Sequence, residues 1–278
     1  MDTIRNIQDR YGIVGRGDEL ALALAVLGAG HHLLLEGPVG VGKTTVALAV
    51  CGHLGRPVYR VDGDDRYTEN KLTGWFDPPV VLKAGYGPDT FTPGPLIRAM
   101  REGGVLFINE LNRMPEAVQN VLLPALDERR IVVPHVGEVM ASPSFLVVAT
   151  QNPVEYVATG HLSEALRDRF EHVGLHYQDE LAEVEIVGKA TGCSDEVMVR
   201  ESVRLTRETR AHPKFKKGAS IRAAMAMVRI AMRLSGPDAL KTAARAALAT
   251  RVDLKDEAGE GLDAILEAVL DDLKKKIR

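Results

Sequence analysis

The chain has few of the residues that mark a secreted, zinc-binding or membrane protein. Its 278 residues include two cysteines, Cys51 and Cys193, which lie far apart and form no Cys-x-x-Cys or Cys/His ligand spacing. The sequence therefore indicates neither a disulfide framework nor a zinc site. The longest apolar run, residues 20–30, is too short to span a bilayer, and residues 1–10 lack the apolar core of a signal peptide. We expect a cytoplasmic protein without a membrane partner.

A large excess of one charge sign is also lacking. There are 35 Lys and Arg against 38 Asp and Glu, a net charge of −3, so the composition carries no broad basic signature of nucleic-acid binding. Two small lysine clusters, at residues 214–217 and 274–276, are typical of solvated helix ends. With 45% hydrophobic residues, the length suits one large or two moderate globular domains.

What the sequence does contain is a glycine-rich stretch between an apolar strand and a helix. Residues 37–44 satisfy G-x-x-x-x-G-K-[ST] after an apolar strand at 33–35, the context of a phosphate-binding loop rather than of a plain turn. Its glycines allow successive N–H groups to turn toward an anion at a helix N-terminus. We expect Lys43 to reach the β- and γ-phosphates of ATP and Thr44 to ligate Mg²⁺. The expected nucleotide-binding residues are Gly37, Pro38, Val39, Gly40, Val41, Gly42, Lys43, Thr44 and Thr45.

An apolar turn at residues 11–16 precedes a helix predicted over about 18–27. Ile13 and Val14 in this turn are candidates to close over an adenine ring. Ordinary packing of the first helix is the alternative.

Further apolar strands end in polar residues. Strands are predicted at 58–61, 105–108, 145–149 and 171–175, and with intervening helices they indicate an α/β fold with a parallel sheet and an active site at the strand C-termini. Asp62 and Glu110 then point toward the phosphates, and Glu110 is the expected general base. Asn109 stands where aspartate is usual. It can bind a magnesium-bound water but contributes no charge, so we expect reduced metal affinity or turnover, and an aspartate there to tighten the magnesium requirement.

At residues 107–115 the chain resembles the D-E-x-N-R segment of MoxR-type AAA+ ATPases. Four other stretches are similar to motifs of that family: the end of its helix-2 insert (92–96), its sensor-1 strand (148–153), its L-x-E-A-x-x-D-R-F box (162–170) and its sensor-2 start (218–223). In order and spacing these motifs cover about residues 11–227. Asn109 is the main departure from the pattern.

The resemblance implies an AAA+ P-loop domain over residues 1–176, with a parallel five-stranded sheet flanked by helices, and an all-helical C-terminal lid over residues 177–278. It makes Asn152 the sensor-1 residue and Arg169 the arginine finger that acts on a neighbouring subunit, with Arg167 as second choice and a surface salt bridge as the alternative. Ser220 is a suitable N-cap for the helix that carries Arg222, which is expected to face phosphate; a solvated arginine is the alternative.

Two segments are expected to protrude from the sheet: an insert at residues 67–94 and a hairpin at 131–140. In the resembled family such protrusions face the ring pore or the client, whereas surface decoration is the alternative. Trp75 and Phe76 either grip a client or pack inside the insert. An apolar stripe at residues 262–277 predicts a last helix that closes the lid core or serves as a docking face.

The resemblance thus implies an ATPase that uses ATP and Mg²⁺ in a homo-oligomeric ring, expected to be a hexamer. Such a ring would remodel or activate a protein client, with a von Willebrand factor A domain protein as partner. A nucleic-acid-associated motor or loader is a second possibility, disfavoured by the acidic net charge. Asn109 keeps a third possibility open, a nucleotide switch with slow turnover.

Overall fold

The computed structural model describes residues 2–153, 162–255, 261 and 264–265. The chain divides into two compact units, one comprising Met1–Pro38 and Gly42–His176 and the other comprising Val39–Val41 and Tyr177–Arg278. Each unit has its own apolar core. Among the described residues, no helix is both long and apolar enough to cross a bilayer.

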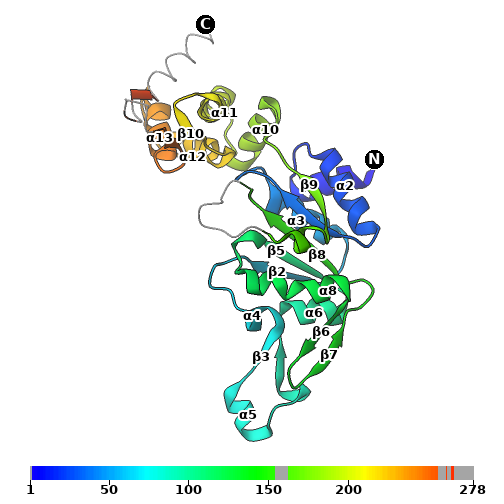
Figure 1. The fold of residues 1–278 in the computed structure, drawn as a ribbon. Coiled ribbons are helices and arrows are strands. Elements are labelled where there is room, and N and C mark those ends of the chain that lie inside the picture. The colour runs from blue at the N-terminus through cyan, green and yellow to red at the C-terminus, as the bar shows by residue number, and fades with distance from the viewer. Residues whose placement is uncertain (1, 154–161, 256–260, 262–263, 266–278) are drawn as a thin grey trace. The chain divides into compact units, whose positions relative to one another are not determined.

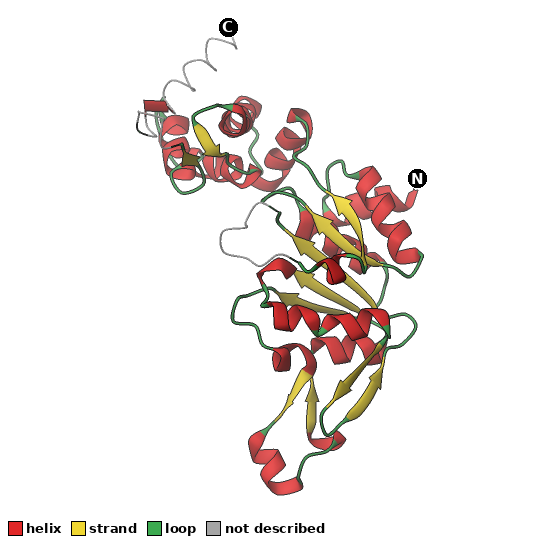
Figure 2. Cartoon of the chain, in the orientation of Figure 1, coloured by secondary structure: helices red, strands yellow, loops and turns green. Residues whose placement is uncertain are grey.

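A five-stranded parallel sheet organises the first unit (Figures 1 and 2). Its spatial order is β2-β5-β8-β1-β9, and every neighbouring pair is parallel. The predicted α/β fold class is therefore confirmed. The strands are β1 (His32–Glu36), β2 (Val58–Asp62), β5 (Val105–Asn109), β8 (Leu146–Gln151) and β9 (Phe170–Gly174).

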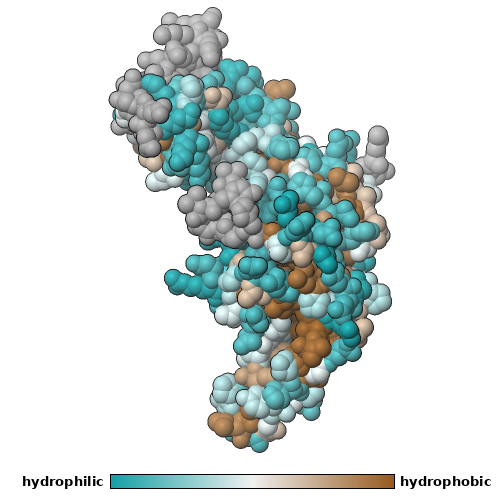
Figure 3. Space-filling view, viewed as in Figure 1, coloured by the Kyte–Doolittle hydropathy of each residue, from teal (hydrophilic) through white to brown (hydrophobic). Residues whose placement is uncertain are grey.

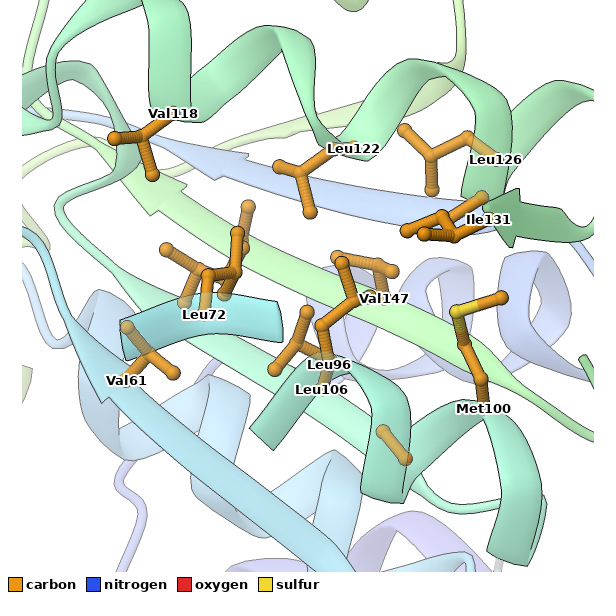
Figure 4. Close-up of a cluster of buried hydrophobic side chains, with 14 of the residues drawn as sticks. Val61, Leu72, Leu96, Met100, Leu106, Val118, Leu122, Leu126, Ile131 and Val147 are labelled. Atoms are coloured by element: carbon orange, nitrogen blue, oxygen red, sulfur yellow. The ribbon is translucent and has the colours of Figure 1, made fainter. Parts of the chain in front are cut away.

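Helices cover both faces of this sheet because its three central strands are apolar on both sides. Leu106 and Ile108 of β5 share a core with α6, α7 and α8, whereas Val105 and Phe107 alternate to the face on which α3 packs. Figure 4 shows residues of α6 and α8 converging on Leu106 and Val147. The helices on the α3 side are α1 (Asp2–Tyr11), α2 (Gly17–Gly28) and α3 (Lys43–His53); those on the other are α6 (Pro95–Glu102), α7 (Glu116–Asn120) and α8 (Leu122–Asp127).

The predicted hairpin and insert both extend away from the sheet (Figure 1). The hairpin consists of β6 (Arg130–Val133) and β7 (Gly137–Met140), paired antiparallel. The insert consists of α4 (Glu69–Thr73), β3 (Gly74–Phe76), α5 (Pro78–Ala84), a 3₁₀ turn (Pro88–Thr90) and β4 (Phe91–Pro93), with β3 and β4 antiparallel. The prediction that both segments protrude from the sheet is confirmed.

The two aromatic residues of the insert differ in their surroundings. The Phe76 ring lies 5.1 Å from Tyr86, 5.2 Å from Phe91 and 6.1 Å from His135 in the hairpin turn, measured between ring centroids. Phe76 therefore joins the insert to the hairpin, whereas Trp75 is 48% exposed. A patch of apolar surface also lies at the end of the insert (Figure 3), where Leu82 and Tyr86 are exposed.

The second unit is mainly helical. Its helices are α10 (Glu180–Thr191), α11 (Glu196–Ala211), α12 (Ile221–Ala231) and α13 (Ala239–Leu248), and the breaks fall near Gly192, Pro213 and Gly236 as predicted. Two short strands that the sequence did not predict, β10 (Phe215–Lys217) and β11 (Asp253–Leu254), pair antiparallel because Phe215 and Val252 enter the same core. The predicted helix at 262–277 lies, apart from 264–265, outside the described residues.

Candidate active site

The phosphate-binding loop runs from the end of β1 to the start of α3. Gly40 has φ +80° and Gly42, the N-cap of α3, has φ +95°, torsions that favour glycine. Gly37 does not have a positive φ. The first turn of a helix such as α3 suits an anion, because the helix itself provides no backbone acceptor for the N–H groups there.

Lys43 lies over this loop. Its Nζ donates hydrogen bonds to the carbonyl oxygens of Gly37, at 2.6 Å, and Pro38, at 2.8 Å. The ammonium group is thus at the turn that the motif assigns to phosphate. Its contact with the β- and γ-phosphates, like the role of Thr45 at the next position, stays a prediction.

A chain of hydrogen bonds links the start of α3 to the ends of β5 and β8. The hydroxyl of Thr44 donates to Oδ1 of Asn109 at 2.9 Å, and the hydroxyl of Thr150 donates to the same oxygen at 3.1 Å. Thr150 in turn accepts from the backbone N–H of Glu110 at 2.9 Å. The two expected magnesium-site residues, Thr44 and Asn109, are therefore in direct contact.

Asn109 also contacts the neighbouring strand β2. Its Nδ2 donates to Oδ1 of Asp62 at 3.0 Å, and Asp62 pairs with Nη2 of Arg60 at 2.7 Å. The hydrogen bond from Arg60 and then that from Asn109 lower the pKa of Asp62 against the opposing effect of burial. The ionised carboxylate of Asp62 therefore contacts the amide group of Asn109, which in turn contacts Thr44.

Glu110 has an unusual backbone conformation. Its φ of +58° and ψ of +52° place it in the left-handed region, which costs a non-glycine residue conformational energy and recurs at functional sites. Oε2 of its carboxylate pairs with Nη1 of Arg113 at 2.8 Å.

The sensor-1 candidate, Asn152, is buried directly after β8. Nδ2 of Asn112 donates to the Asn152 backbone oxygen at 3.4 Å. Asn112, Thr150 and Arg60 were not among the predicted site residues. Two of them had a sequence signal: Asn112 is the asparagine of the D-E-x-N-R segment, and Thr150 lies at the end of an apolar strand.

The adenine candidates and Arg222 differ in how far they are buried. Val14 is buried and Ile13 half-buried, which agrees with helix packing as well as with an adenine wall, so their role stays a prediction. Arg222 is exposed in the first turn of α12. Ser220 is the N-cap residue as predicted, although its side chain makes no capping hydrogen bond.

The two candidate arginine fingers have different environments. Arg169 donates from Nε to Oδ1 of Asp127 at 2.7 Å and from Nη1 to the carbonyl oxygen of Ala165 at 2.6 Å. The side chain of Arg167, at the end of α9 (Glu164–Arg167), is exposed. Geometry within one chain leaves their action on a neighbouring subunit a prediction.

The donor set fits Mg²⁺ bound together with nucleotide. A hydroxyl, an amide oxygen and nearby carboxylates are hard oxygen ligands, and Mg²⁺ usually takes one or two protein ligands plus phosphates and waters. No group of three or more His, Cys, Asp or Glu residues among the described part of the chain is arranged to hold a metal. The site therefore suits a cation that binds as a complex with the nucleotide phosphates.

The fold and this site define a P-loop nucleotidase of AAA+ architecture. Residues 32–170 match the family described as "AAA domain (dynein-related subfamily)". The chain belongs to this family and is an AAA+ ATPase of the MoxR type.

Relatives agree with that assignment. The chain is 35% identical to protein NorQ of Paracoccus denitrificans over 64% of each chain, and 30% identical to the gas vesicle ATPase GvpN of Ancylobacter aquaticus over 75% of this chain and 62% of GvpN. The matches thus span less than two thirds of these two relatives. An uncharacterized protein of Staphylococcus saprophyticus is 30% identical over 89% of this chain and 92% of its own length.

Solved structures show the same fold at lower identity. The RuvB Holliday junction branch migration motor of Thermotoga maritima has a TM-score of 0.54 at 20% identity, covering 94% of this chain and 78% of RuvB. A crystal structure from Cytophaga hutchinsonii has a TM-score of 0.52 at 24% identity, covering 97% of this chain and 94% of that one. At these identities the likeness concerns the fold alone.

Proposed function

We propose that this chain binds ATP with Mg²⁺ and hydrolyses it to ADP and phosphate, through the nucleotide-binding residues and candidate catalytic residues described above. The observation that carries the proposal is the hydrogen bond between Thr44 and Asn109, which joins the phosphate-binding loop to the strand end that bears Glu110. Thr44 and, through a water molecule, Asn109 would hold Mg²⁺, which would neutralise charge that develops on the phosphates. Glu110 orients and deprotonates the attacking water, and Asn152 helps to position it.

The use of this hydrolysis is proposed as remodelling of a protein client. In this proposal residues 1–176 form the nucleotide domain and 177–278 its lid, and the subunits assemble as a homo-hexameric ring in the cytoplasm. A von Willebrand factor A domain protein is the proposed partner. Support comes from the MoxR-type family and from the insert and hairpin, which expose apolar residues such as Trp75, Leu82 and Val132.

A slow nucleotide switch is the second candidate function, and a specific observation favours it. Asn109 replaces a charged residue, and the Glu110 carboxylate is paired with Arg113. Both features would slow hydrolysis without preventing binding. In a switch, client affinity would follow which nucleotide is bound rather than the turnover rate.

Three measurements test the proposal together. Light scattering with ATP and Mg²⁺ should show a ring, phosphate release should show turnover, and affinity purification from the native cell with the Glu110→Gln variant should retain a protein client. Assembly and client binding without measurable turnover would favour the switch. A monomer that binds no nucleotide would overturn both functions.

A further inference from the structure

We propose that Asp62 is a positioning residue that supplies, through the amide of Asn109, the negative charge that the Mg²⁺ site lacks at position 109. This inference rests on the proposed function. The acidic side chain therefore lies at the end of β2, whereas the family pattern has it at the end of the adjacent strand β5.

Strand pairing brings these two residues together. Asp62 and Asn109 are register partners at the last positions of β2 and β5. Both side chains therefore leave the sheet at its C-terminal edge, where the phosphate-binding loop also lies. The hydrogen bond between them, 3.0 Å from Nδ2 to Oδ1, follows from that register.

Asp62 determines which way the Asn109 amide points. An ionised carboxylate only accepts hydrogen bonds, so the NH₂ end of the amide must face Asp62. The oxygen end then faces Thr44 and Thr150, whose hydroxyls donate to it. Without Asp62 the amide loses the acceptor that holds its NH₂ group, and it can present either end to the metal site.

Asp62 also contributes charge. Its side chain is 59% exposed and pairs with Arg60, which offsets part of its negative charge. Because Mg²⁺ is divalent and dehydrates reluctantly, outer carboxylates that orient its ligands strengthen its binding. In the Asp62–Asn109 pair, Asn109 thus provides the acceptor oxygen and Asp62 provides the negative charge. A single aspartate at position 109 would provide both.

The pairing alters the outcome expected for an aspartate at position 109. Asn109→Asp would place two carboxylates at hydrogen-bond distance, and like charges at such a distance repel. The expectation that this substitution alone improves the magnesium site therefore has to be revised. The productive change would be the exchange, Asp62→Asn together with Asn109→Asp.

The test measures how binding of a non-hydrolysable ATP analogue depends on Mg²⁺, by calorimetry in EDTA and across a Mg²⁺ titration. Asp62→Asn should raise the Mg²⁺ concentration for half-saturation by roughly ten- to a hundredfold, with binding in EDTA unchanged. The exchange variant should return the half-saturating concentration to within a few fold of the wild type. In EDTA, Asn109→Asp alone should melt at a lower temperature than the exchange variant, because only the single variant opposes two carboxylates.

Arg60→Gln is the matched control, because a purely structural Asp62 would serve only as the ion-pair partner of Arg60. Our proposal requires that Arg60→Gln leave Mg²⁺ binding as tight as in the wild type or tighter. Loss of Mg²⁺ binding in Arg60→Gln equal to that in Asp62→Asn would overturn it, and so would an Asp62→Asn variant with wild-type Mg²⁺ dependence. If Asp62→Asn melts early, Asp62→Ser takes its place. A wild-type chain that binds no nucleotide would instead refute the proposed function.

Discussion

Nε of Arg169 lies 2.7 Å from Oδ1 of Asp127, so the guanidinium joins the end of α8 to the residues that follow α9 in the same chain. This ion pair makes the pKa of Asp127 lower than usual, chiefly through the hydrogen bond from Arg169. It also holds Arg169 in one orientation. If Arg169 acts on a neighbouring subunit, the ion pair with Asp127 either orients the guanidinium for that role or has to break first.

Arg169→Ala should bind ATP almost normally yet hydrolyse it far more slowly. An arginine finger stabilises charge that develops in the transition state, and in well-studied nucleotidases it contributes roughly 10³ to 10⁵ in rate. Steady-state phosphate release, beside a binding titration, measures both quantities. Arg167→Ala is the matched comparison: if it loses turnover and Arg169→Ala does not, the second choice is the finger.

Asp127→Asn and a mixing experiment separate catalysis from structure. If Arg169 serves only as a salt-bridge partner, Asp127→Asn should reproduce the loss seen in Arg169→Ala. A finger that acts between subunits predicts that mixing Arg169→Ala with Glu110→Gln restores some activity, since some interfaces then combine both intact residues. A mixture that co-assembles by light scattering but regains nothing would exclude a shared site.

Lys43→Ala should abolish nucleotide binding, whereas Glu110→Gln should retain it and stop hydrolysis. The lysine is the charged side chain at the loop carbonyls of Gly37 and Pro38, so its removal takes away the charge that phosphate needs there. Glutamine keeps the size of Glu110 but cannot accept a proton. Calorimetry of both variants checks this, and a folded Glu110→Gln chain that fails to bind ATP would contradict the general-base assignment.

Local patterns predicted most of the fold. The apolar runs of β1, β5 and β8 are continuous because these strands are buried on both faces, and the hairpin and insert have clear turn signals. The pair β10–β11 was missed because a strand of two or three residues has no period of its own. It forms through contacts between segments more than 30 residues apart in the sequence.

The candidate site was predicted residue by residue but not as a network. The motif identified Lys43, Thr44 and Glu110, because each role is tied to a position in the local pattern. The bond between Asp62 and Asn109 depends on β2 lying beside β5 in matching register, and strand order is not a property of either segment. The ion pairs of Glu110 and Arg169 likewise depend on backbone conformations that the residue types alone do not dictate.

Nucleic acid should neither stimulate hydrolysis nor bind with a steep salt dependence. A protein that neutralises several phosphates loses affinity by orders of magnitude as salt rises, and this chain has a net charge of −3. Filter binding of single- and double-stranded DNA at two salt concentrations is sufficient. Tight, salt-sensitive binding would favour the motor-or-loader alternative.

The last prediction concerns His32, which is buried at the start of β1. Burial, and to a smaller extent Arg129 and His31, lower its pKa from 6.5 to about 4, and its Nδ1 accepts a hydrogen bond from the Val147 backbone N–H at 3.0 Å. Since the unfolded chain takes up the proton first, this histidine costs stability as the pH falls from 6.5 toward 4, about 1 kcal/mol between pH 7 and 5.5. His32→Gln keeps an acceptor without the titration, so urea unfolding should show a smaller decrease over that range in the variant. An equal decrease in both proteins would mean that His32 is protonated in the folded state.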